Sequence, residues 1–231
     1  MRKIFLILLL ANGIFSNAQK TIEGGIMAGG LFYIGEINPS SLFQSTKFGG
    51  GLFARYNLNK RWAFRGNITL GTLTSDDTYS SHKYQETRNL NFNTPIAEIV
   101  AQAEFNFLPY KIGATRHNSF FTPYLASGIG FLLVTNSIHP YQITLPLSFG
   151  IKFAVSKKLE IGFEWSFRKT FSDHIDNLSG KEYEPFTMNT SNKSKYKQIA
   201  FLYNKDWYSY AGIFITYKIF QSGSSCKAYD F

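Results

Sequence analysis

The densest group of side chains that could support catalysis lies at Ser172-Asp173-His174-Ile175-Asp176, where two carboxylates flank an imidazole beside a hydroxyl. Such a group could bind a cation or assist the hydrolysis of a lipid ester. Serine and aspartate at a junction between a strand and a loop more often bond to the local backbone. The histidines, which have no ligand spacing among themselves, are His82, His117, His139 and His174. We therefore expect no metal ion and no other cofactor.

The chain also lacks the short motifs of common enzymes. It has no G-x-S-x-G, no glycine-rich phosphate loop and no pair of cysteines, since Cys226 is its single cysteine. We expect a protein that is not an enzyme and that has no small-molecule substrate. Lipid hydrolysis by histidine, serine and glutamate side chains is the enzymatic alternative.

Charged and amide side chains form a second group, because they alternate with large apolar residues along several segments. In Leu159–Phe171, read L-E-I-G-F-E-W-S-F-R-K-T-F, every second residue up to Phe167 is large and apolar. This period of two is typical of a β-strand with one apolar and one polar face. The polar faces of such segments carry Arg55, Arg65, Glu98, Gln102, Glu104, Lys152, Glu160, Glu164 and Arg168.

Eight segments have the pattern of strands. They are Ile22–Tyr33, Lys47–Asn57, Arg61–Leu73, Pro95–Leu108, Phe120–Val134, Gln142–Val155, Leu159–Phe171 and Trp207–Phe220. Two architectures would place an apolar face opposite a polar one. In a soluble sandwich the apolar faces meet in a core, whereas in a membrane barrel they face lipid and the polar faces line a lumen. A sandwich gives no reason for charges of both signs on the polar faces.

The connections and the composition favour the barrel. Short turns at Asn57–Lys60 and Ser156–Lys158 contrast with long polar stretches at Thr74–Thr94 and Ser172–Asp206, as in outer-membrane barrels. Aromatic residues make up 17% of the chain and charged residues only 17%, below the roughly 25% of typical soluble domains. We predict an all-β fold, an eight-stranded antiparallel transmembrane β-barrel of the outer-membrane type. The expected aromatic girdles at the membrane surfaces include Trp62, Tyr124, Trp207, Tyr208 and Tyr210.

The first residues have the pattern of an export signal. Met1-Arg2-Lys3 is followed by an apolar run from Ile4 to Leu10 and by Ser16-Asn17-Ala18, the features of a secretory signal peptide cleaved after Ala18. We therefore assign residues 1–18 to a signal peptide, 19–220 to the barrel and 221–231 to a short periplasmic tail. The expected location is the outer membrane of a Gram-negative cell.

An eight-stranded barrel has room inside for little more than its own side chains. The alternating charges could form a catalytic or proton-conducting network there, or ion pairs that fill the lumen. We expect a structural plug, because buried charges need partners and no nucleophile stands among them. The plug residues are Arg55, Arg65, Glu98, Glu104, Glu160, Glu164 and Arg168. A plugged lumen predicts that the barrel is not a diffusion channel.

The turns expected on the periplasmic side are basic. They carry Lys60, Arg61, Lys111, Arg116, Lys157 and Lys158 with no acidic residue among them, and the chain has a net charge of +9. Two interpretations are open: contact with anionic phospholipid head groups, and docking of a periplasmic protein by complementary charge. The export signal argues against nucleic acid as a partner. The candidate partner contacts are Lys60, Arg61, Lys157, Lys158 and Cys226, whose thiol could pair with another chain.

Several motifs follow one another in an order that resembles a known family. Gly35-Glu36-Ile37-Asn38-Pro39 is similar to a G-D/E-x-N-P element, and Arg55–Gly66 is similar to an R-Y-N-x-x-x-R-x-A-x-R-G hairpin. The further matching stretches are Arg88–Phe92, Glu98 with Gln102 and Glu104–Phe107, Thr122–Tyr124, and Arg168–Asn177. Together they resemble the PorG-like outer-membrane barrels of Bacteroidota, a component of the type IX secretion machinery. Where that family reads D-Y-x-D-D-x-S, Asp173–Ser179 has one acidic residue fewer, which argues further against a cation site.

The resemblance implies an eight-stranded barrel that associates with the periplasmic ring built from the PorK lipoprotein and PorN, and it implies no enzymatic activity. The expected function is a non-enzymatic outer-membrane barrel, surrounded by outer-membrane lipids, that anchors or positions the type IX secretion machinery through that ring. The alternative is a small outer-membrane barrel for surface adhesion through Ser172–Asp206 or for lipid hydrolysis.

Overall fold

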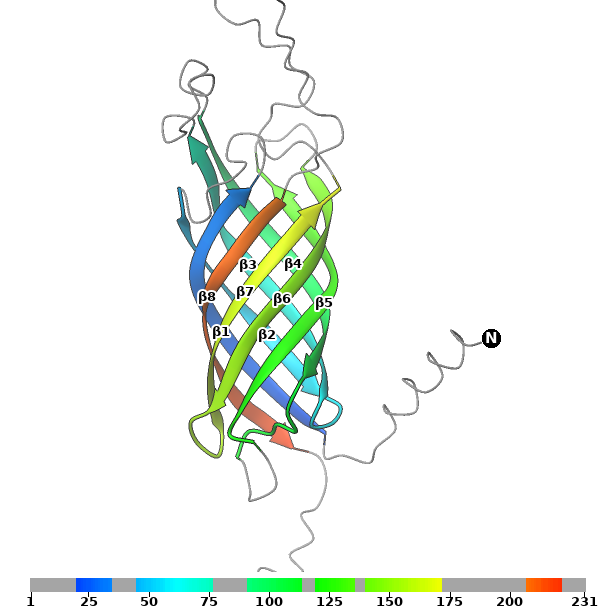
Figure 1. Ribbon diagram of the computed structural model, residues 1–231. Helices are drawn as coiled ribbons and strands as arrows, with labels where there is room; N and C mark the ends of the chain where they lie inside the picture. Colours follow the sequence, from blue (N-terminus) through cyan, green and yellow to red (C-terminus); the bar gives the residue numbers. More distant parts are fainter. Residues whose placement is uncertain are drawn as a thin grey trace, which may run out of the picture.

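The alternation along the sequence is realised as eight strands, each paired in antiparallel fashion with its neighbours in the chain (Figure 1). The computed structural model describes residues 20–34, 45–76, 91–113, 119–135, 140–171 and 207–221. The strands are β1 (Thr21–Ile34), β2 (Lys47–Asn57), β3 (Trp62–Asp76), β4 (Asn91–Asn106), β5 (Phe121–Val134), β6 (Tyr141–Ala154), β7 (Leu159–Thr170) and β8 (Trp207–Gln221). Pairing of β1 with β8 closes the barrel. No helix within these described ranges is long and apolar enough to cross a membrane.

The observed strands differ from the predicted ones mainly at their ends. The bounds of β2 are as predicted, whereas β3 continues past Leu73 and β4 begins before Pro95. Asp76 pairs with Asn91, so the predicted loop Thr74–Thr94 is wrong at both ends. Strand pairing is made by backbone groups and does not need apolar side chains. It therefore continues into this polar part of the hairpin, where the side chains do not alternate and the sequence does not predict a strand.

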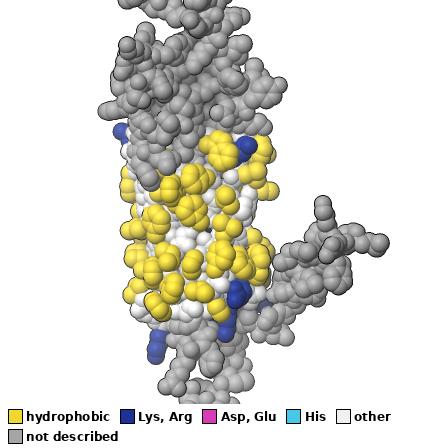
Figure 2. Space-filling view, in the orientation of Figure 1, with side chains coloured by type: hydrophobic (Ala, Val, Ile, Leu, Met, Phe, Trp, Pro, Cys, Tyr) yellow, Lys and Arg dark blue, Asp and Glu magenta, His cyan; other side chains and the backbone are white. Residues whose placement is uncertain are grey.

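The outward side chains of the barrel are apolar. Near the middle of the wall, the cross-strand neighbours Leu52, Ile68 and Ile99 are 63%, 50% and 60% exposed. Figure 2 shows hydrophobic side chains over the visible wall, with Lys and Arg side chains toward its two ends. Such a large exposed apolar surface is unfavourable in water and favourable in lipid.

The inward side chains are polar and charged, the reverse of a soluble domain. Arg55, Glu104 and Glu160 are 1%, 0% and 0% exposed. A charged interior inside an apolar wall is the arrangement of a transmembrane barrel. The predicted fold, an eight-stranded antiparallel transmembrane β-barrel of the outer-membrane type, is therefore confirmed.

The two short turns are stabilised by side-chain oxygens that accept hydrogen bonds from backbone N–H groups. Asn59 Oδ1 accepts from the N–H groups of Arg61 and Trp62, both at 2.8 Å. Ser156 Oγ accepts from the N–H of Leu159 at 3.1 Å. Asparagine and serine commonly form turns in this way, and here they fix the backbone that carries the basic residues of both turns.

Replacement of Ile99 by arginine tests whether the outer wall meets lipid. Ile99→Arg should lower the free energy of unfolding by roughly 2–4 kcal/mol, the cost of an arginine near the bilayer midplane. Val155, which follows β6 and is 60% exposed, provides the control, because an arginine near the membrane surface costs about 1 kcal/mol or less. Denaturant titration of the barrel in lipid vesicles measures both variants. Equal losses would contradict a wall that spans a membrane.

Candidate functional site

The structure places all seven predicted plug residues inside the lumen, each at most 2% exposed. Gln102 and Lys152, predicted on the same face, are buried beside them. Sequence reasoning misses Glu23 of β1, which is 3% exposed and also lies in the lumen. Its neighbours Gly24 and Gly25 hide the alternation of that strand, although Ile22 and Ile26 still mark its outward face.

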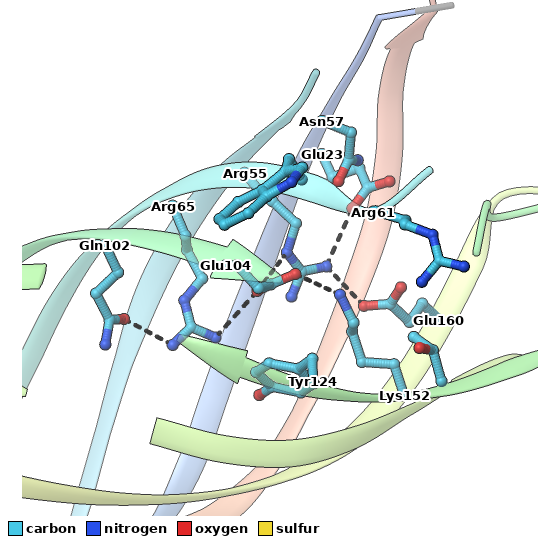
Figure 3. A network of polar contacts seen from close by, with 12 residues as sticks. Glu23, Arg55, Asn57, Arg61, Arg65, Gln102, Glu104, Tyr124, Lys152 and Glu160 are labelled. Atoms are coloured by element: carbon cyan, nitrogen blue, oxygen red, sulfur yellow. Dashed lines mark hydrogen bonds and ion pairs between the residues drawn. The ribbon is translucent and has the colours of Figure 1, made fainter. Parts of the chain in front are cut away.

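Arg55 joins carboxylates from three other strands (Figure 3). Its Nη1 donates to Glu23 Oε2 at 3.1 Å and to Glu160 Oε1 at 2.7 Å. Its Nε donates to Glu104 Oε2 at 3.2 Å. Hydrogen bonds between charged groups are about twice as strong as neutral ones. One guanidinium on β2 therefore ties together β1, β4 and β7.

Glu104 is shared by three cations. Besides the bond from Arg55, it accepts a hydrogen bond from Lys152 Nζ, and its Oε2 lies 3.8 Å from Arg65 Nη1. The side chain of Glu104 has no exposure to solvent. Because a buried ion without a partner is strongly unfavourable, this one carboxylate makes the burial of several positive charges possible.

Arg65 and Glu164 form a two-point ion pair in the middle of the barrel. Arg65 Nη1 lies 2.5 Å from Glu164 Oε2, and Nη2 lies 3.0 Å from Oε1. The Tyr124 hydroxyl donates to the same carboxylate at 2.6 Å, and Arg65 Nη2 also donates to Gln102 Oε1 at 2.8 Å. A planar guanidinium bound at two points has a fixed orientation, so the pair connects β3 and β7 across the lumen in a defined geometry.

The polar contacts continue along the lumen through neutral groups. Gln102 Nε2 donates to Ser148 Oγ at 3.0 Å. Farther along, Glu98 Oε1 accepts from the Thr144 hydroxyl at 2.7 Å, and Glu98 Oε2 lies 3.0 Å from Arg168 Nε. The lumen is therefore filled by ion pairs and by the amides and hydroxyls that connect them.

Each lumen cation also lies over two aromatic rings, at 4.7 to 6.0 Å from the ring centroids. The contacts are Arg55 with Phe53 and Phe214, Arg65 with Phe53 and Tyr124, Lys152 with Tyr110 and Tyr124, and Arg168 with Tyr208 and Tyr210. The ring face attracts a cation. The rings therefore add to the attraction that the carboxylates exert on each lumen cation.

The predicted aromatic girdles are wrong for three of their members. Tyr124, Tyr208 and Tyr210 are 1%, 0% and 1% exposed and contact cations inside the lumen. Trp62 and Trp207 begin β3 and β8 on the outer face, at opposite ends of the wall. The alternation itself reveals the error, because each of the three tyrosines shares the parity of the lumen-facing residues on its strand.

Apolar side chains close the lumen beyond Arg168. They are Leu31, Leu73, Ile96, Leu132 and Val134, each at most 4% exposed. The side chain of Leu31 lies on Gly49 and Gly71, where an added Cβ would be 2.6 and 2.3 Å from its Cδ1. The two glycines therefore make room for this layer. Apolar side chains across a narrow lumen disfavour the passage of ions and water.

The connection between β4 and β5 closes the opposite end, which we call the mouth. Tyr110 and Ile112 are 6% and 1% exposed. The Tyr110 N–H donates to the Lys60 carbonyl in the β2–β3 turn at 3.1 Å. Lys218 Nζ of β8 donates to the Ile112 carbonyl at 3.1 Å. The connection is thus fixed to two sides of the mouth and covers it.

Two residues show how closely this connection fits. The Tyr110 ring lies 5.4 Å from Lys152 Nζ, and burial together with the negative charge of Glu160 raises the pKa of Tyr110, so the phenol stays neutral. Gly113 has a φ of 83°, and an added Cβ would lie 2.8 Å from the Lys157 carbonyl oxygen. Glycine alone adopts this backbone conformation readily and leaves that space free.

The basic residues of the two short turns lie together at the mouth end of the barrel. Lys60, Arg61, Lys157 and Lys158 are all exposed. The nearest described acids, Glu23 and Glu160, point into the lumen toward Arg55. Of the three other residues predicted on this surface, Lys111 is half-buried, and Arg116 and Cys226 lie outside the described residues. We call the four exposed residues the basic rim.

The described residues do not assemble a recognisable catalytic group. The four histidines and Ser172–Asp176 lie outside the described ranges, so their interpretation stays a prediction. In the part of the chain that the structure describes, no three His, Cys, Asp or Glu side chains are grouped as metal ligands. The described residues therefore form a lumen filled by ion pairs and an exposed basic rim.

Comparison with known proteins identifies a family and several barrels of similar architecture. The family described as "Domain of unknown function (DUF6089)" matches residues 1–228. No curated protein matches the chain. Among solved structures, Ail, the attachment invasion locus protein of Yersinia pestis, is 12% identical with a TM-score of 0.43, over 88% of this chain and 100% of that one. Neisserial surface protein A is 12% identical with a TM-score of 0.46, over 87% of this chain and 97% of that one. OprG of Pseudomonas aeruginosa is 8% identical with a TM-score of 0.46, over 87% of this chain and 99% of that one.

Glu104→Gln should destabilise the barrel more than Glu23→Gln. Glu23 lies 3.1 Å from Arg55, which keeps its contacts with Glu104 and Glu160 when the Glu23 charge is removed. Loss of the Glu104 charge breaks the ion pair of Lys152 and weakens that of Arg55. We expect Glu104→Gln to cost about 3–5 kcal/mol in the free energy of unfolding, and Glu23→Gln about 1 kcal/mol. Denaturant titration that gave the opposite order would contradict this account.

The purified barrel should not conduct ions. Ion pairs fill the lumen, and Leu132 and Ile112 stand among the apolar residues that close its two ends, at 0% and 1% exposed. Single-channel recordings in planar bilayers should therefore show no steady open state. A stable open-pore current from the folded protein would show that the lumen is not sealed.

Proposed function

The chain belongs to the DUF6089 family, and we propose that it is a non-enzymatic outer-membrane barrel that anchors or positions the type IX protein secretion machinery. It would do so through a periplasmic ring complex of proteins similar to PorK and PorN. Outer-membrane lipids surround the wall in this proposal, and the mouth end faces the periplasm. The order of the motifs in Arg55–Gly66, Glu98–Phe107 and Arg168–Asn177 supports the secretion role through the resemblance described above.

The observation that carries the proposal is the fixed backbone of the basic rim. Arg61 Nη1 donates to the Phe107 carbonyl at 2.8 Å, which joins the β2–β3 turn to the end of β4. The Lys218 N–H donates to the Lys158 carbonyl at 2.9 Å, which joins β8 to the β6–β7 turn. Exposed charges of one sign on a fixed backbone orient an acidic partner and accelerate its association.

The sealed lumen supports a binding role over a transport role. Both ends of the lumen are closed by apolar side chains, and the charges between them are paired within the protein. The surfaces left for function are the wall and the two ends. No observation on the described residues favours surface adhesion through Ser172–Asp206 or lipid hydrolysis, the two alternatives from the sequence.

Charge reversal on the basic rim tests the proposal. The cleanest variant is Lys157→Glu with Lys158→Glu, because Arg61 also holds the Phe107 carbonyl and its loss could loosen the mouth. We expect recovery of the ring proteins with the tagged barrel in gentle detergent to fall roughly tenfold or more, since reversed rim charges weaken association with an acidic partner. Mass spectrometry of the co-purified proteins measures the recovery.

The matched control reverses two lysines at the opposite end of the barrel. Lys47→Glu with Lys169→Glu changes the net charge by the same amount and should leave recovery of the ring proteins unchanged. Heat-modifiable migration on gels shows that both variants are folded. Unchanged recovery with the folded rim variant would reject docking through the basic rim, and ester hydrolysis by the purified barrel would favour the enzymatic alternative.

A further inference from the structure

The outer face of the wall has a groove of about 510 Å³ across β2, β3 and β4. Along it runs a row of small residues, Ala54, Gly66 and Ala101, which are paired with one another in the antiparallel register. All three are exposed on the face that meets lipid. Large side chains border the row on β3, where Phe64 lies toward the mouth and Ile68 toward the other end, at 55% and 50% exposed. We call this recess the wall groove.

The described part of the barrel does not require a glycine at the centre of the wall groove. Beyond its own chain neighbours, an added Cβ at Gly66 would have no atom nearer than the Val100 carbonyl oxygen, at 4.0 Å. At Gly51 of β2, by contrast, it would lie 2.0 Å from the Ile68 carbonyl oxygen. A glycine inside a strand commonly marks a bulge, a bend or the close approach of a ligand. The register through Gly66 has no bulge, and among the described glycines only Gly113 has a positive φ. Gly66 therefore indicates that a ligand packs against the wall here.

The depth of the wall groove matches one membrane leaflet. Gly66 follows the exposed Arg61 of the β2–β3 turn by five residues. This separation is about 16 Å along a strand and about 12 Å along the membrane normal at the usual tilt of about 40°. One leaflet contributes about 15 Å of hydrocarbon. A lipid with its phosphate beside Lys60 and Arg61 would therefore reach the wall groove with an acyl chain.

The shape of the wall groove favours a single acyl chain over a second copy of the barrel. The large exposed side chains around the row, among them Leu52, Phe64 and Ile99, would meet another convex wall first and keep it away from the small residues. A stable protein interface also buries about 1,000 Å² or more, which three small residues do not offer. A flexible chain can enter the recess and contact carbon atoms at its base and on both sides.

We propose that the wall groove binds one acyl chain of an anionic phospholipid from the leaflet at the mouth end, with the lipid phosphate at Lys60 and Arg61. Both residues are exposed, and basic side chains near a membrane surface attract anionic head groups. Because the chain and the head group are bound at the same time, this lipid stays longer than its neighbours around the wall. The site depends on the lipid-facing wall and not on the secretion partner proposed above.

Native mass spectrometry of the full chain, titrated with phosphatidylglycerol in detergent, tests the site by counting the lipids that each barrel retains. The unaltered protein should retain one phosphatidylglycerol molecule. Gly66→Leu fills the wall groove and should weaken retention about tenfold, because about ten carbon contacts of the acyl chain are lost. Ala101→Leu, at the position paired with Gly66, serves as a second variant and should have a similar effect. Heat-modifiable migration on gels shows that each variant is folded.

The matched control adds the same side chain to the outer wall away from the wall groove. Ala28 of β1 is exposed and does not line the groove, so Ala28→Leu should leave the retention of phosphatidylglycerol unchanged. Equal retention by Gly66→Leu and Ala28→Leu, or no lipid retained by the unaltered protein, would overturn the proposal. A dimer of the unaltered protein that Gly66→Leu dissociates would also overturn it, because the groove would then be an interface between copies.

A second comparison tests the place of the head group. Lys60→Gln should weaken the retention of phosphatidylglycerol about fivefold, from the usual contribution of a lysine near an anionic surface. The same variant should not change the retention of phosphatidylcholine, whose head group has no net charge. An equal effect of Lys60→Gln on both lipids would overturn the assignment of the phosphate to this turn.

Discussion

A charge enclosed in a narrow barrel must find every partner on the wall around it, because neither water nor lipid can satisfy it there. Arg55 donates hydrogen bonds to carboxylates from three other strands, and the rings of Phe53 and Phe214 lie 5.3 and 5.7 Å from its guanidinium carbon. The rest of the structure depends on this arrangement. A shift of β2 by one residue would turn Arg55 toward lipid and leave Glu23 and Glu160 without their cation. The ion pairs inside the lumen therefore help to set the register of the strands, together with the apolar side chains outside.

The same constraint determines where the protein can act. The lumen charges form ion pairs with one another, and the apolar layer at one end and Tyr110 with Ile112 at the other are buried. We therefore expect no route for a solute through the lumen. The connection that closes the mouth has a second effect, because it carries Lys111 and contacts both basic turns. The connection between β4 and β5 therefore both closes the lumen and holds the basic turns in place. It links the ion pairs of the lumen to the basic rim.

Local pattern accounts for what the sequence could predict. The period of two is a property of each strand alone. It therefore predicts the eight strands, and the inward direction of Arg65, Glu104 and Glu164, without knowledge of which strands pair. Which carboxylate meets which cation is not local, because Arg55 reaches partners 32 and 105 residues away. The prediction for Tyr208 is wrong because it follows the general preference of tyrosine for membrane surfaces and not the parity of the strand, which places this residue in the lumen. The closure of the mouth by Tyr110 had no periodic signal at all, since its position depends on contacts with three other elements.

The network around Arg55 also bears on how the chain enters a membrane. Its partners stand on β1, β4 and β7, so they come together only when nearly the whole sheet has formed. A partly assembled sheet would expose unpaired Arg55 and Glu104 to hydrocarbon, where each ionised side chain is costly. Insertion one strand at a time would therefore pass through states of high free energy, and insertion coupled to closure avoids them. The charged lumen makes the folding of this barrel cooperative, because only a complete ring of strands in register is compatible with the interior of a membrane.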